Sequence, residues 1–179
     1  MTFCQAFADE SVRKSFIFCV VLVFPEDFAP IRGEFRSLCK PGQQRVHMTS
    51  ESDSRRREIL SVVARLPVRA RLFEARLGGG RSQRVVRDDC LRVAVADLAN
   101  EPVKALVIES CDQDQRDRQV ITEIARKVAL PEDFRYRHDR PAVEPLLWLP
   151  DVVAWAHGKG GDWGRRVVRT IDTVVKIDP

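Results

Sequence analysis

Apolar stretches predict the buried strands of this chain. In residues 103–108 both alternating faces are mainly apolar, with Lys104 the exception, and the stretch runs directly into Glu109, which is typical of a central strand covered on two sides. Residues 16–24 form a second apolar stretch, and residues 3–9 precede it through a short polar link. This arrangement predicts an antiparallel hairpin near the start of the chain.

Helical periodicity fills most of the remaining sequence. Helices are expected over 26–39, from the Ser/Asp-rich segment at 50–54 through Leu66, and over 83–100, 116–130 and 146–157. Residues 68–77 predict a strand at or near a sheet edge, 134–138 a short strand, and 170–177 a closing strand or helix end. Gly160, Gly161 and Gly164 predict a loop around Trp163. The order predicts one α/β domain over residues 1–179, with a mixed sheet of about five strands flanked by helices.

Composition narrows the class of protein only a little. The net charge of +4 combines 30 basic with 26 acidic residues, so the arginines suit a phosphate-bearing partner or simply a solvated surface. Five cysteines without a C-x-x-C pair predict reduced thiols in a cytoplasmic protein. The apolar run at 16–24 is too short to span a bilayer and follows acidic residues, so neither a signal peptide nor a membrane segment is expected.

Three acidic residues occupy positions where an apolar residue or an ordinary helix start is expected. Asp9 ends the first predicted strand, Glu109 ends the central one, and Asp151 lies in the first turn of an unusually apolar helix. Each has a structural alternative: a turn-initiating Asp, the first solvated residue after a strand, or a partner for the helix dipole. If their elements converge on one sheet edge, the carboxylates need divalent cations to lie together.

His47 and Glu51 flank the start of the second long helix, and they need not share one helical face. The segment 50–57 is also readable as a well-capped helix that begins with a solvated charge cluster. Mg²⁺ or Mn²⁺ ions about 4 Å apart, held by Asp and Glu, activate water and stabilise the leaving oxygen in phosphodiester hydrolysis. The acidic residues therefore make such a reaction the leading hypothesis.

The motifs ADES after the first strand, VHMTSESD before a helix, LVIES on a later strand and LLWLPDVVAWAHG near the end resemble domain-of-unknown-function family 3800. That family is similar to the RNase H-like, or retroviral-integrase-like, superfamily. The resemblance implies metal-binding carboxylates at Asp9, Glu109 and Asp151, with His47 in the family's histidine segment. Val12 stands where the family commonly has Gly, and Pro150 where it often has Ala.

Glu51 is a further candidate metal ligand. The three metal-binding carboxylates named above could each be replaced by Glu10, Glu51 or Asp112. Two functions follow from the resemblance. The first is a nuclease that uses Mg²⁺ or Mn²⁺ on RNA or DNA, with Asp9, Glu109, Asp151 and His47 as its catalytic residues. The second is a non-catalytic module on the same fold that binds nucleic acid or protein.

In the nuclease, a set of arginines would hold the phosphate backbone. Those arginines are Arg55, Arg56, Arg57, Arg165 and Arg166. A third hypothesis, a thiol hydrolase, would pair Cys90 or Cys111 with His47 or His138, but no nucleophile motif surrounds either cysteine.

Overall fold

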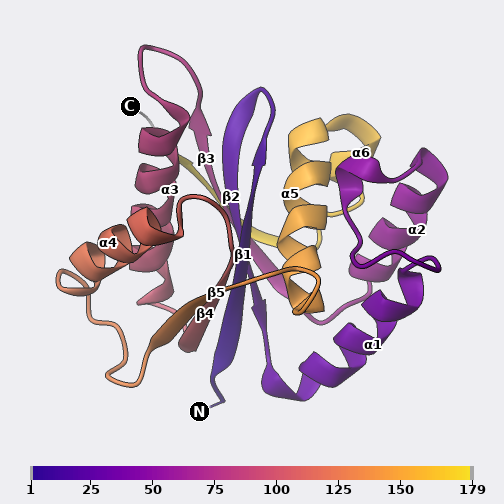
Figure 1. The fold of residues 1–179 in the computed structure, drawn as a ribbon, viewed down its shortest axis with the longest axis horizontal. Coiled ribbons are helices and arrows are strands. Elements are labelled where there is room, and N and C mark those ends of the chain that lie inside the picture. Colours follow the sequence, from indigo (N-terminus) through magenta and orange to yellow (C-terminus); the bar gives the residue numbers. More distant parts are fainter. Residues whose placement is uncertain (1, 178–179) are drawn as a thin grey trace.

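A computed structural model describes residues 2–177 and shows six strands in one mixed sheet (Figure 1). The strand order is β5-β4-β1-β2-β3-β6. Strand β2 is antiparallel to both of its neighbours, and the other neighbouring pairs are parallel. The strands are β1 (Cys4–Val12), β2 (Ser15–Val23), β3 (Arg69–Arg76), β4 (Val103–Glu109), β5 (Arg135–Asp139) and β6 (Ile171–Ile177).

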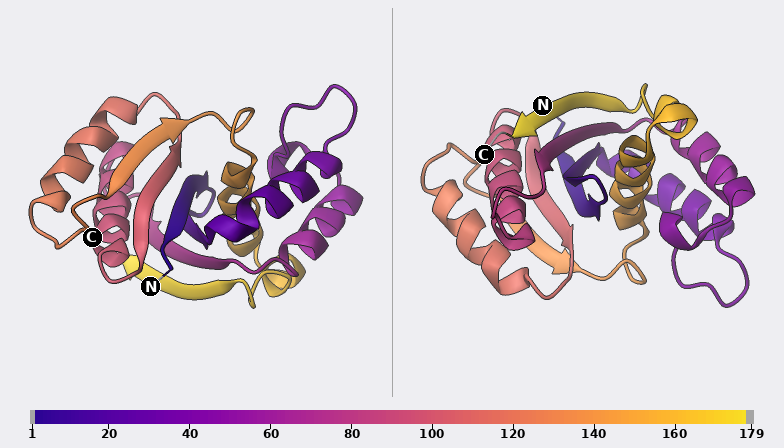
Figure 2. Two further views of the ribbon diagram at one scale, coloured as in Figure 1. Left: turned by 90° about the horizontal axis from the view of Figure 1, so that it is seen from below. Right: turned by 90° about the horizontal axis from the view of Figure 1, so that it is seen from above.

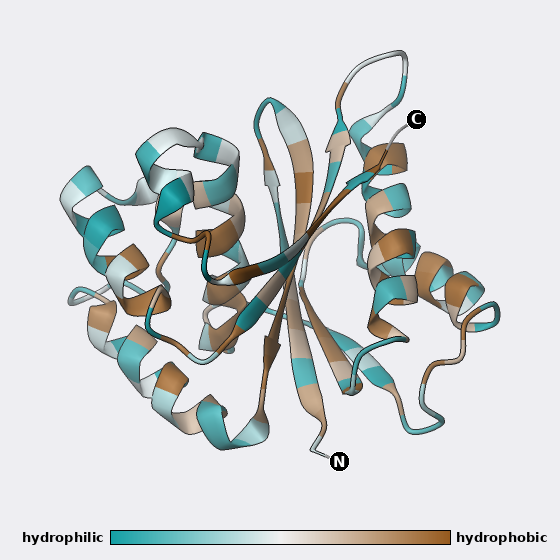
Figure 3. Cartoon of the chain, turned by 180° about the vertical axis from the view of Figure 1, so that it is seen from behind, coloured by the Kyte–Doolittle hydropathy of each residue, from teal (hydrophilic) through white to brown (hydrophobic). Residues whose placement is uncertain are grey.

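Helices cover both faces of the sheet (Figure 2). One face packs on α1, α2 and α5, and the other packs on α3 and α4, so the apolar residues form one core on each side of the sheet. The hydrophobic colouring is concentrated on the central strands and on bands of the helices (Figure 3). The helices are α1 (Phe28–Leu38), α2 (Asp53–Val63), α3 (Gln83–Leu98), α4 (Asp114–Ala125), α5 (Trp148–Lys159) and α6 (Gly161–Arg165).

Helix α5 is buried along most of its length. Every residue from Trp148 to Ala156 is buried, because the helix lies against β1 and β2 on one side and contacts α2 on the other. A helix surrounded by protein needs apolar residues on all sides, which explains the run LLWLPDVVAWA. Asp151 is the one ionisable residue in this buried run, and it is 5% exposed.

The hairpin of β1 and β2 is longer than the sequence predicts. Strand β1 continues past Asp9 to Val12, and only Arg13 and Lys14 separate the two strands. Asp9 therefore lies inside a paired strand, opposite Cys19, and does not begin a turn. Extension of the ladder by three residues satisfies backbone groups that an earlier turn would leave unpaired.

Other expectations differ in detail. The sheet has six strands because 171–177 pairs with β3 and becomes the edge strand, which leaves β3 one position from the edge. The glycine-rich segment around Trp163 forms the short helix α6 instead of a loop. Helix α4 ends at Ala125, before the predicted end at residue 130. No helix within residues 2–177 is both long and apolar enough to cross a membrane.

A buried ion network ties α3, α4 and β5 together. Arg87 donates two hydrogen bonds to Asp117, with Nε–Oδ1 and Nη2–Oδ2 distances of 3.1 and 2.8 Å, and His138 Nε2 lies 3.0 Å from the same Oδ2. Asp117 has no exposed surface. Burial opposes its ionisation, but the bonds from His138 and Arg87 outweigh burial and lower the pKa of Asp117.

We expect Asp117→Ala to destabilise the fold by about 3–5 kcal/mol, because the buried Arg87 guanidinium loses the more buried of its two carboxylate partners. Since the pKa of Asp117 is lowered, its contribution is present at neutral pH and is lost as the pH falls below the ordinary range of an aspartate. Denaturant unfolding at pH 7 and pH 3 measures both effects. The control is Glu123→Ala, whose exposed pair with Lys127 contributes at most about 1 kcal/mol. Equal losses in the two variants would contradict the assignment.

Candidate metal centre

Three carboxylates from three elements approach one another at the carboxyl edge of the central strands. Ala8 of β1 pairs with Ile108 of β4, so Asp9 and Glu109 follow at the same level of the two parallel strands. Phe7 and Val107, two residues earlier, belong to the core on the α5 side of the sheet. Side-chain alternation then turns Asp9 and Glu109 to that side, where α5 presents Asp151 from its first turn.

Asp9 has the most strongly perturbed electrostatics of the three. Burial raises the pKa of Asp9 well above the usual range, and the negative charges of Glu109 and Asp151 raise it further. Its Oδ1 accepts a hydrogen bond from the backbone N–H of Glu10 at 2.7 Å. This bond and the nearby charge of Arg45 do not offset burial and two neighbouring carboxylates, so protonation of Asp9 is favoured, and a further cation would favour its ionised form.

The segment between α1 and α2 covers this site and fixes Asp151. The backbone N–H of Met48 donates to Asp151 Oδ2 at 3.0 Å, and His47 Nδ1 lies 3.4 Å from the same oxygen. The interaction with Asp151 raises the pKa of His47, against a smaller opposing effect of burial. Arg56 of α2 donates to the carbonyls of Met48 and Thr49, which holds this segment in place.

Arg45 is a site residue that sequence reasoning missed. Its Nη1 donates to Glu109 Oε1 at 2.8 Å and its Nη2 to Oε2 at 3.3 Å. Arg45 and His47 are two residues apart in the segment before α2, and both side chains reach the cluster. That spacing, just before the predicted helix start, is the signal that could have identified Arg45.

The other acidic candidates have partners elsewhere. Glu51 is buried, accepts from Gln43 Nε2 at 2.5 Å and lies 3.5 Å from Arg55 Nε. Glu10 points to the opposite face of the sheet and pairs with Arg87. Asp112 is exposed in the loop between β4 and α4. The structure therefore brings together Asp9, Glu109, Asp151 and His47, and it places Glu51 in a separate ion pair.

A second acidic group lies on the other face. Among residues 2–177, only Asp114, Asp117 and His138 form a group of three whose ligand atoms all lie within 4.8 Å of one another. However, both oxygens of Asp117 accept from Arg87, and those of Asp114 accept from the Ser110 hydroxyl and the Cys111 N–H. This group is more tightly clustered than Asp9, Glu109 and Asp151, whose ligand atoms do not all lie within 4.8 Å of one another. The two groups differ in their electrostatics, because the donors around Asp117 lower its pKa, whereas the pKa of Asp9 is raised.

The donor chemistry of the first group fits a hard divalent cation. Carboxylate oxygens are the ligands that Mg²⁺ and Mn²⁺ prefer, and the insufficient compensation of Asp9 is the local reason that a cation would be stabilising there. The thiols, by contrast, are poor nucleophiles. Burial raises the pKa of Cys90 to about 12, and it also raises that of Cys111.

The order of the sheet, its helices on both faces and the carboxylates at the edge define an RNase H-like fold. A chain of the PCNA:RNase HII complex from Archaeoglobus fulgidus superposes with a TM-score of 0.60 at 14% identity, covering 93% of this chain and 76% of that one. Bst-RNase HIII in complex with Mn²⁺ superposes with a TM-score of 0.53 at 10% identity, and a mutant of the same enzyme superposes with a TM-score of 0.54 at 11% identity.

Each RNase HIII comparison covers 86% of this chain but 51% of the RNase HIII chain, so this chain spans about half the length of those proteins. No protein-family model matches the chain, and no curated protein is detectably similar in sequence. At these identities the likeness shows the fold, and membership of domain-of-unknown-function family 3800 stays a prediction.

In EDTA, we expect Asp9→Asn to stabilise the protein at pH 7.5, with a rise of a few degrees in Tm. Because the folded-state pKa of Asp9 is raised, the wild type loses stability as the pH rises above the ordinary range of an aspartate, and the neutral amide removes this loss. Below about pH 4, where the carboxyl is protonated in both states, the difference should vanish. Thermal unfolding across pH measures it, and a destabilised variant at pH 7.5 would refute the assignment.

Proposed function

We propose that this protein is a divalent-metal-dependent nuclease that hydrolyses phosphodiester bonds of RNA or DNA. The observation that supports the proposal is the raised pKa of Asp9, which results from its burial and from the negative charges of Glu109 and Asp151 nearby. The similarity in fold to RNase HII and RNase HIII, one of them in complex with Mn²⁺, supports the same class of reaction.

Asp9, Glu109 and Asp151 would hold Mg²⁺ or Mn²⁺, which supplies activation of water and stabilisation of the developing negative charge. Asp151 is oriented for this role by the Met48 N–H, which leaves its second oxygen, Oδ1, without that constraint. Glu51 is the weaker ligand candidate, because Gln43 and Arg55 already engage its carboxylate.

His47 is placed to move a proton at the edge of the site. Its side chain is 43% exposed, and the Asp151 carboxylate beside it raises its pKa. A protonated imidazole beside the cluster can donate to a leaving oxygen and be recharged from solvent. Arg45 can pair with a substrate phosphate oxygen once Glu109 binds a cation, because its fork of donors matches either group.

Nucleic acid is the proposed partner, and the cytoplasm is the proposed location. All five cysteines are free, and three of them are buried, which agrees with a reducing compartment.

The direct experiment combines thermal unfolding with a cleavage assay. We expect millimolar Mn²⁺ or Mg²⁺ to raise the Tm of the wild type relative to EDTA, by mass action on the folded state, and to support cleavage of labelled RNA or DNA. Asp9→Asn should abolish the metal-dependent shift and reduce cleavage at least about 100-fold. Glu26→Gln, which removes an exposed carboxylate just after the end of β2, at the opposite edge of the sheet, should retain both properties.

A wild type whose Tm is unchanged by either metal, with no cleavage of any strand tested, would contradict the nuclease. In that case, one observation favours a non-catalytic interaction module. Arg45 already neutralises Glu109 with two hydrogen bonds, so the fold can hold this carboxylate without a metal ion. The protein would then be a non-catalytic interaction module.

A further inference from the structure

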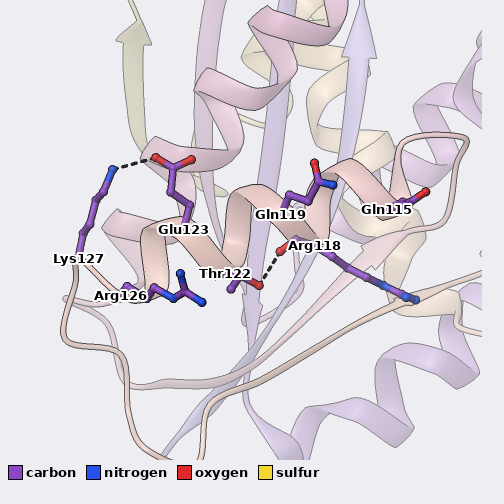
Figure 4. A pocket seen from close by; sticks show the side chains of 7 residues that line it. All are labelled: Gln115, Arg118, Gln119, Thr122, Glu123, Arg126 and Lys127. Carbon is purple, nitrogen blue, oxygen red and sulfur yellow. Dashed lines mark hydrogen bonds and ion pairs between the residues drawn. The ribbon is translucent and has the colours of Figure 1, made fainter.

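Three adjoining hollows, which share lining residues, lead from the strand that carries Asp9 along the outer face of α4. The first is a hollow of about 240 Å³ beside Glu10, which is lined by Gln83, Arg84, Arg87 and Gln113. A second hollow of about 320 Å³ shares Arg84 and Gln113 and extends to Gln119. The largest hollow, of about 630 Å³, shares Gln119 and continues to Lys127 (Figure 4). We call the three together the α4 groove.

Positive charge predominates along the α4 groove. It is lined by six basic and three acidic residues. The basic residues are Arg84, Arg87, Arg116, Arg118, Arg126 and Lys127, and the acidic ones are Glu10, Asp112 and Glu123.

The basic residues fall into two groups. Arg87, Arg116 and Lys127 already form ion pairs, with Asp117, Asp88 and Glu123 respectively. Arg84, Arg118 and Arg126 are exposed and form no ion pair within residues 2–177. Three uncompensated guanidinium groups therefore line one groove.

The spacing of these residues suits a chain of regularly repeated anions. Arg118, Thr122 and Arg126 are four residues apart and so form one stripe on α4, as Figure 4 shows, while Gln115 and Gln119 form the neighbouring stripe. The 12 residues of α4 span roughly 18 Å, the length of about five stacked nucleotides at 3.4 Å each. Guanidinium groups bind phosphates, and the amides and the hydroxyl can bind sugar or base atoms.

We propose that the α4 groove binds a single nucleic-acid strand through its phosphates and guides it toward Asp9. Glu10, at the start of the groove, is the immediate neighbour of Asp9 on β1, and its charge is compensated by Arg87. The nucleic-acid strand would thus pass from one face of the sheet, beside β1 and over the end of β4 at Glu109, to the carboxylates on the other face. The choice of nucleic acid rests on the proposed function, whereas binding itself does not require cleavage.

The test compares two triple variants with matched charge. The groove variant is Arg84→Ala/Arg118→Ala/Arg126→Ala. The control variant, Arg36→Ala/Arg76→Ala/Arg169→Ala, removes three exposed arginines that lie outside the groove and form no ion pair among the described residues. Both variants should retain the wild-type Tm, because neither loses an ion pair or a buried side chain.

Binding of fluorescein-labelled 20-nucleotide single-stranded RNA and DNA is measured by anisotropy in EDTA, between 50 and 200 mM salt. We expect the groove variant to bind on the order of tenfold more weakly, and its plot of log K against log salt to lose about two units of slope, since each phosphate contact contributes about 0.7. The control should remain within about twofold of the wild type.

Three results would overturn the proposal: undiminished binding by the groove variant, an equal loss in the control, or displacement of the strand by a poly-glutamate peptide at equal concentration of charge. The outcome is separable from that of the nuclease. Absence of Mn²⁺-dependent cleavage with normal groove-dependent binding would refute the nuclease alone, and cleavage by a wild type whose binding is insensitive to the groove variant would refute the groove alone.

Discussion

The arrangement of the site depends on one buried carboxylate in an otherwise apolar helix. Asp151 interrupts the buried run of α5, and a buried charge is tolerated only when donors or cations compensate it. The Met48 N–H supplies one donor and thereby fastens the segment between α1 and α2 over the sheet edge. As a result, His47 and Arg45 lie beside β1 and β4, although they are distant from both strands in the sequence.

The charges of Glu10 and Asp9, adjacent residues of β1, are compensated in different ways. Glu10 faces α3 and is neutralised by Arg87, which also binds the fully buried Asp117. Asp9 faces α5, where carboxylates outnumber the cations and its pKa is raised. The first face is held together by its own ion pairs, and the second is stable in its ionised form only with an additional cation. This contrast is why we propose a metal site at Asp9 and not at the more compact group of Asp114, Asp117 and His138.

Much of the fold was predictable because the strands and helices have distinct hydrophobic periods. The hairpin, the central β4 and the buried α5 all follow from runs that a single sequence displays. The edge strand β6 was ambiguous, because its residues alternate between partly buried and exposed, and a strand without a fully buried face has a weak hydrophobic pattern. The helix α6 was missed because its glycines favour a loop locally, while Trp163 packs against Trp155 and stabilises the helical turn.

The site was predictable in part for the same reason. Acids at the ends of buried elements are conspicuous, so Asp9, Glu109 and Asp151 stood out from sequence alone. Arg45 and Arg87 did not, since an arginine in an Arg-rich chain carries no signal until its partner is known. Glu51 was a plausible ligand from its place before α2, but a helix start does not determine which way a preceding side chain turns, and here Arg55 holds it.

The most direct measurement is the anomalous scattering of a crystal soaked in Mn²⁺, which locates the ion without reference to activity. The account predicts a peak within about 2.0–2.6 Å of carboxylate oxygens of Asp9 and at least one of Glu109 and Asp151, with Arg45 displaced from Glu109. A peak at Asp114, Asp117 and His138, or none at saturating Mn²⁺, would contradict it.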